Sequence, residues 1–84
     1  NVVMVNTSEE EAKLLLQAKI VRHLKRNNTM DHASLTKAVR EDTAQFIPGE
    51  VTEELFPKAI KMLKEKEYLK SEQVAGQVVY TYVP

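Results

Sequence analysis

Three segments with helical spacing are followed by one segment with a period of two, and this order most constrains how the 84 residues can fold. The helical segments span about residues 8–26, 31–41 and 52–66, where apolar side chains recur every three to four positions. Residues 78–83 alternate between two sets of side chains, which is typical of a β-strand. A chain of this length forms one small domain. We therefore expect a single α+β domain with its strands near the C-terminus.

The first helix carries start and stop signals. Ser8 is a good N-cap, and Glu11, three residues later, completes a capping box. The pair Asn27-Asn28 can end the helix just after two basic residues of its last turn. Helical spacing predicts one face of this segment to lie in the core, consisting of Leu14, Ala18, Val21 and Leu24, with Ile20 widening the stripe.

A turn separates the second and third helices. Asp31 is the N-cap candidate of the second helix, whose Leu35, Ala38 and Val39 are expected to face inward. Residues 46–49 contain proline followed by glycine, which breaks the helical pattern. The third helix is expected to begin late, at about residue 52, or to bend at Pro57. The aromatic and aliphatic side chains expected in the core of this half are Phe46, Leu55, Phe56, Ala59, Ile60, Leu63, Tyr68 and Tyr82.

The C-terminal segment predicts a β-hairpin. Residues 68–70 and 78–83 are strand-like, and residues 74–77 can form the connection between them. Three helices followed by a hairpin match the winged-helix plan, in which a helix-turn-helix core carries a β-hairpin wing. We assign residues 8–84 to this winged-helix domain and residues 1–7 to an incoming linker.

The composition excludes several classes of protein. Twelve Lys and Arg residues balance 12 Asp and Glu residues, which argues against a dedicated polyanion binder. No apolar stretch approaches the ~20 residues of a membrane span, and the absence of cysteine excludes disulfides and thiolate metal sites. His23 and His32 lack a third ligand at a suitable spacing, so we predict no metal and no cofactor. Without an initiator Met or a signal peptide, the chain is expected to be part of a longer protein.

Five motifs, in order and at matching spacing, resemble the C-terminal winged-helix domain of cullins. Residues 13–25 (KLLLQAKIVRHLK) resemble the family's LIQAAIVRIMK, and residues 31–35 resemble the xHxxL start of its second helix. Residues 46–48 are similar to FxP, and residues 65–69 to ExEYL. Residues 80–84 resemble the terminal YxYxA, with proline in place of alanine. The similarity extends over nearly the whole chain.

The resemblance implies a function and a modification site. In cullins the last lysine of the first motif receives the ubiquitin-like modifier of neddylation, and Lys25 matches that position. The implied role is a non-catalytic scaffold module in a multisubunit RING ubiquitin ligase of the cytoplasm and nucleus. The implied partners are a RING subunit, a ubiquitin-conjugating enzyme and the modifier. Lys19, six residues earlier, does not share a helix face with Lys25 and is the weaker candidate.

Some positions depart from the family pattern. Lys19 replaces a usual alanine, His23-Leu24 replaces Ile-Met, and Pro57 interrupts the third helix. The segment between residues 42 and 54 is also unusually acidic. These departures leave open a divergent cullin or the cullin-like subunit of the anaphase-promoting complex.

The alternative function is a winged-helix nucleic-acid-binding domain, with the third helix as its recognition helix. This segment lacks Arg, Asn and Gln, the side chains best suited to read bases. Five lysines in and just after this segment are nearly cancelled by four glutamates, which argues against nucleic-acid binding. The charged residues are Lys58, Lys61, Lys64, Lys66, Lys70, Glu53, Glu54, Glu65 and Glu67.

Overall fold

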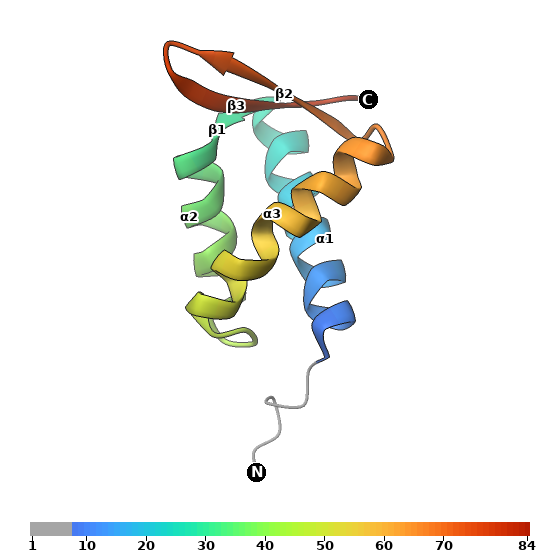
Figure 1. The fold of residues 1–84 in the computed structure, drawn as a ribbon, viewed down its shortest axis with the longest axis vertical. Coiled ribbons are helices and arrows are strands. Elements are labelled where there is room, and N and C mark those ends of the chain that lie inside the picture. The colour runs from blue at the N-terminus through green and yellow to red at the C-terminus, as the bar shows by residue number, and fades with distance from the viewer. Residues whose placement is uncertain (1–7) are drawn as a thin grey trace.

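The computed structural model describes residues 8–84, so the predicted linker at residues 1–7 lies outside the described residues. Three helices stand side by side, and a small sheet lies across one end of them (Figure 1). This arrangement confirms the predicted α+β winged-helix architecture. In chain order the elements are α1 (Glu9–Asn27), β1 (Thr29–Asp31), α2 (His32–Thr43), α3 (Gly49–Glu65), β2 (Leu69–Val74) and β3 (Gln77–Tyr82).

The sheet is antiparallel and has three strands in the order β1-β3-β2. The predicted hairpin is present, and both of its strands extend closer to the turn than expected. Strand β1, which pairs Met30 with Tyr80, was not predicted. Its three residues are too few to show an alternating pattern, so only the pairing with a distant strand defines it.

The hairpin turn has the geometry that its two-residue loop requires. Ala75 and Gly76 both have positive φ, 53° and 80°, and they join β2 directly to β3. Positive φ at both loop positions is the conformation whose twist matches that of the flanking strands. Glycine adopts it freely, whereas alanine there is strained by its Cβ.

The predicted helix caps are confirmed. The Ser8 hydroxyl accepts a hydrogen bond from the Glu11 N–H at 3.1 Å, and the Glu11 carboxylate accepts one from the Ser8 N–H at 3.0 Å. Asp31 caps α2 by accepting from the Ser34 N–H at 3.1 Å. Side-chain and backbone hydrogen bonds from Ser34 lower the pKa of Asp31. Local sequence signals therefore fix the start of both helices.

The predicted core face of α1 is wrong at Leu14 and Ala18, whereas Ile20 and Leu24 are buried as expected and Val21 packs against the core. Leu14 is 60% exposed and Ala18 is also exposed, whereas Leu16 and Ile20 are completely buried. The helix is rotated so that a stripe at i, i+4 spacing faces α2 and α3; it consists of Ala12, Leu16, Ile20 and Leu24. Apolar residues occur on both faces of this helix, so their spacing alone did not select the buried one.

Helix α3 begins three residues earlier than expected. Pro48 acts as its N-cap, with its carbonyl accepting from the N–H groups of Val51 and Thr52, both at 3.0 Å. Pro57 lies inside the helix rather than near its first turn. Its missing N–H removes the usual donor for the carbonyl of Glu53, and its ring lies on the exposed side.

The core lies between the three helices and under the sheet. Phe56 and Leu63 of α3 are 1% exposed, and Leu24 of α1 and Leu35 of α2 are fully buried, as expected. The prediction that Phe46 and Tyr68 lie in the core is wrong, because Phe46 is 52% and Tyr68 is 50% exposed. Both lie at the ends of α3, where the turns direct them outward. No helix in residues 8–84 is long and apolar enough to cross a membrane.

Candidate modification site at the end of α1

Lys25 lies in the last turn of α1 and its side chain is exposed. Its chain neighbour Leu24 is fully buried. The two side chains point in different directions because successive helical residues are turned by about 100° around the axis. Within residues 8–84, no hydrogen bond or ion pair holds the Lys25 ammonium group. The group is therefore available to a protein that approaches from solvent.

The backbone around Lys25 is anchored on the side facing the sheet. Asn28 ends the helix with φ 69°, and its N–H donates to the Leu24 carbonyl at 2.6 Å. The Asn28 carbonyl accepts a hydrogen bond from the N–H of Tyr82 in β3 at 2.8 Å. These bonds join the end of α1 to the sheet. The site thus combines a free side chain with a fixed backbone.

A second anchor joins α1 to α2. His23 Nε2 lies 2.5 Å from Asp42 Oδ2, and the His23 side chain is largely buried. The hydrogen bond from His23 is the main reason why the pKa of Asp42 is lowered, and the positive charges of Lys19 and Arg22 lower it further. The sequence pattern indicated only that His23 is no metal ligand and gave no sign of its pairing with Asp42. Nothing in the spacing of two residues 19 positions apart could have revealed this contact.

Lys19, the weaker candidate, is placed differently from Lys25. It is only half-exposed and lies on the side of α1 that faces Asp42. The structure therefore separates the two lysines, as their helical spacing predicts. Lys25 is the more exposed of the two residues.

The outward face that includes Lys25 also carries apolar side chains. Leu14, Ala18, Val21 and Lys25 follow one another at spacings of four, three and four residues, which places them within about 60° around the helix. Leu14 is 60% exposed and Ala18 is exposed, whereas Val21 is half-buried at the edge of this face and packs against the core. We refer to Leu14, Ala18 and Val21 as the outward stripe.

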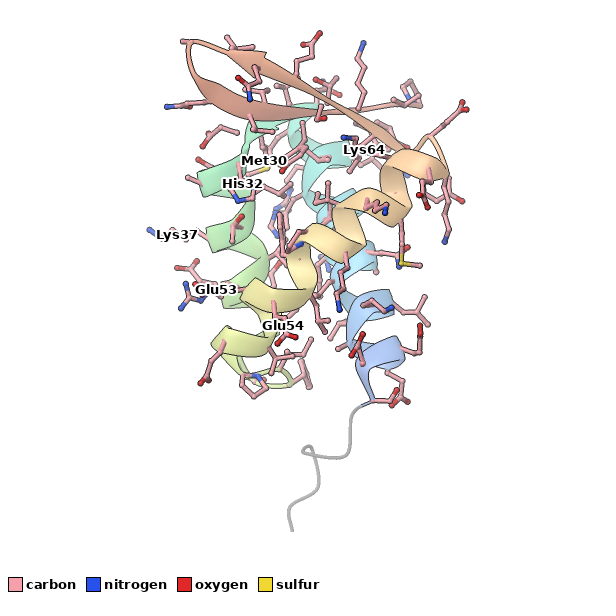
Figure 2. All side chains as sticks on the ribbon, in the orientation of Figure 1. Met30, His32, Lys37, Glu53, Glu54 and Lys64 are labelled. Carbon is pink, nitrogen blue, oxygen red and sulfur yellow. The ribbon has the colours of Figure 1, made fainter. Side chains whose placement is uncertain are left out.

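His32, the other histidine, contacts Tyr80 of β3 and Phe56 of α3. Its Nδ1 lies 2.8 Å from the hydroxyl of Tyr80, and its ring meets Phe56 edge-on at 5.5 Å between centroids. Burial raises the pKa of Tyr80. In Figure 2, His32 lies at the start of α2 close to Met30 of β1. No group of three or more potential metal ligands occurs in the described part of the chain.

The outer face of α3 divides into an acidic half and a basic half. Figure 2 shows Glu53 and Glu54 near the start of the helix and Lys64 near its end. Glu53 pairs with Arg40 of α2 at 2.8 Å, and Lys61 is exposed on the basic half. An acidic half on this helix would repel the phosphates that a recognition helix has to approach.

Comparison with known proteins identifies the family. Residues 11–74 match the family described as the cullin protein neddylation domain. The chain is also similar to Cullin-1 of Schizosaccharomyces pombe, with 36% identity over 77 residues that cover 92% of this chain and 9% of the relative. The chain therefore spans only a small part of the curated relative that it matches. With its winged-helix fold and this similarity over most of its length, the chain belongs to the cullin family.

Proposed function

We propose that the domain is the C-terminal winged-helix module of a cullin-type scaffold in a multisubunit RING ubiquitin ligase, and that Lys25 accepts a ubiquitin-like modifier. The family match to a neddylation domain supports the scaffold role. The assignment of Lys25 as the acceptor is supported by its free, exposed side chain on an anchored helix end.

The reaction requires only an amine from this domain. The neutral Lys25 amine attacks the carbonyl of the thioester that joins the modifier to its carrier, an isopeptide bond forms, the C–S bond breaks, and the carrier leaves as a thiolate. The proton lost from the amine is taken up by a base of the modifying enzymes or by solvent. The domain therefore acts as the acceptor and supplies no catalytic group.

The outward stripe gives the attached modifier a place to rest. Lys25 lies at the end of this stripe, so a modifier tethered there is held close to Leu14 and Val21. Occupying the stripe would remove it from any other contact that the domain makes. Attachment would thereby shift the scaffold between conformations in which its RING subunit and ubiquitin-conjugating enzyme are differently placed.

The test is modifier transfer by a neddylation enzyme set to the wild-type domain and two variants. Lys25→Arg keeps the positive charge at the helix end but cannot form the isopeptide bond, so we expect modification to fall to background. Lys19→Arg is the matched control on the same helix and should be modified as the wild type is. Circular dichroism should show that both variants remain folded. Undiminished modification of Lys25→Arg would refute the assignment.

A further inference from the structure

Strand β2 has a free edge. In the order β1-β3-β2 its outer side has no neighbouring strand within residues 8–84. The N–H of Val83 donates to the carbonyl of Tyr68 at 3.0 Å, which sets the phase of the ladder with β3. Hydrogen-bonded pairs alternate along an antiparallel ladder, so even-numbered residues of β2 bond to β3. The odd-numbered residues, Leu69, Ser71 and Gln73, direct their N–H and C=O groups to the free edge.

The side chains along this edge are unusual for a surface. Leu69 is buried, so the even-numbered side chains point away from the helices. Tyr68 and Val74 on this outer face are 50% and 52% exposed, although both are large and apolar. Between them lie the exposed, oppositely charged Lys70 and Glu72. The row therefore reads apolar, basic, acidic, apolar.

We propose that this edge pairs antiparallel with β2 of a second copy of the chain, with Ser71 opposite Ser71. In this register Lys70 faces Glu72 of the second copy, and Tyr68 faces Val74 of the second copy. Two-fold symmetry makes each of these contacts twice. They fall on non-hydrogen-bonded pairs, where facing side chains approach most closely. The exposed apolar side chains Tyr68 and Val74 thus cover one another.

The neighbouring registers do not offer this complementarity. Only shifts by two residues keep the outward N–H and C=O groups of both strands facing. One such shift places Glu72 opposite Glu72, and the other places Lys70 opposite Lys70. Like charges directly opposite one another are destabilising. The charge order therefore favours a single register, and it is the one that also pairs the apolar residues.

The contact is small, so association should be weak. One added six-residue strand buries less than the ~1,000 Å² expected of a stable interface. We expect pairing to be detected by sedimentation equilibrium, and by concentration-dependent NMR shifts of residues 68–74, as the domain approaches about 1 mM. This proposal does not depend on the function of Lys25.

The experiment compares the association of charge variants. Lys70→Glu sets two carboxylates against each other and should weaken association about tenfold or more. Adding Glu72→Lys to Lys70→Glu restores opposite charges in reverse order and should recover the association. Lys61→Glu on α3 changes the net charge equally but lies off the edge, so it should leave association near the wild-type value.

A backbone variant provides an independent test. Ser71→Pro removes an outward N–H at the symmetry axis, a position where an edge strand tolerates proline. It should abolish association while circular dichroism shows a folded domain. Equal weakening by Lys70→Glu and Lys61→Glu, or no recovery in the double variant, would overturn the pairing. A wild-type domain that stays monomeric at about 1 mM would also overturn it and leave the edge to an extended segment of another protein.

Discussion

His23 Nε2 and Asp42 Oδ2 lie 2.5 Å apart, so the second-to-last turn of α1 is tied to the last turn of α2. The contact lies two residues before Lys25 and on a different side of the helix. It therefore contributes to holding the backbone of Lys25 without covering its side chain. Asp42 is charged in this contact, and its pKa is lowered by the hydrogen bond from His23.

Acidification should weaken this contact. Because the pKa of Asp42 is lower in the folded than in the unfolded chain, where it is about 3.9, its stabilising contribution is complete above that value. The contribution is lost as pH falls through the lower, folded pKa. For a partly exposed pair we expect about 0.2–1 kcal/mol. Urea unfolding at pH 6 and at pH 2 measures how much free energy of unfolding is lost on acidification. This loss should be smaller for Asp42→Asn than for wild type. An equal loss in both proteins would mean that the contact does not stabilise the fold.

Truncation of Leu63 should be costly. This side chain is 1% exposed in the core, so Leu63→Ala should lower the free energy of unfolding by about 2–5 kcal/mol. Lys64→Ala, the next residue but turned outward, should change it by at most ~0.5 kcal/mol. Urea midpoints of the two variants provide the measurement. Equally small shifts would contradict the packing of α3.

The hairpin loop should be improved by removing the strain at Ala75. Because Ala75 has a φ of 53°, which strains alanine but not glycine, Ala75→Gly is expected to raise stability by a few tenths to about 1 kcal/mol. Ala44 is the matched control, since its φ of −57° suits alanine and Ala44→Gly should lower stability by about 0.4–1 kcal/mol. Thermal unfolding of both variants distinguishes the two effects. A destabilised Ala75→Gly would show that the loop conformation is not strained.

Nucleic-acid binding should be weak and nonspecific. The acidic half of α3, with Glu53 and Glu54, opposes the basic half around Lys64. We expect DNA affinity to fall steeply with salt, as it does when only phosphates are contacted. Fluorescence anisotropy with unrelated duplexes provides the measurement. A sequence-selective complex that persists at ~200 mM salt would support the nucleic-acid-binding alternative instead.

The sequence was informative where a structural feature depends on near neighbours. Ser8 and Glu11 predicted the start of α1, and the period of two predicted the hairpin. The predicted buried face of α1 was wrong at Leu14 and Ala18, because Leu14, Leu15 and Leu16 spread apolar surface over about 200° around the helix. Only packing against α2 and α3 decides which of the three is buried.

The surroundings of the site depend on residues far apart in the chain. Lys25 could be named from the resemblance, but the contact of His23 with Asp42 could not, since its partners lie on different helices. The bond from Tyr82 to Asn28 likewise depends on how the sheet closes over α1. Such contacts follow from the tertiary fold and leave no local pattern in the sequence.

We propose that the Lys25 amine, and no other lysine of the domain, carries the modifier. The most direct measurement is peptide mapping by mass spectrometry of the wild-type domain after reaction with a neddylation enzyme set. We expect one added modifier, with the isopeptide remnant on Lys25 and with Lys19 and Lys37 unmodified. A remnant found mainly on Lys19 or Lys37, with Lys25 free, would contradict it.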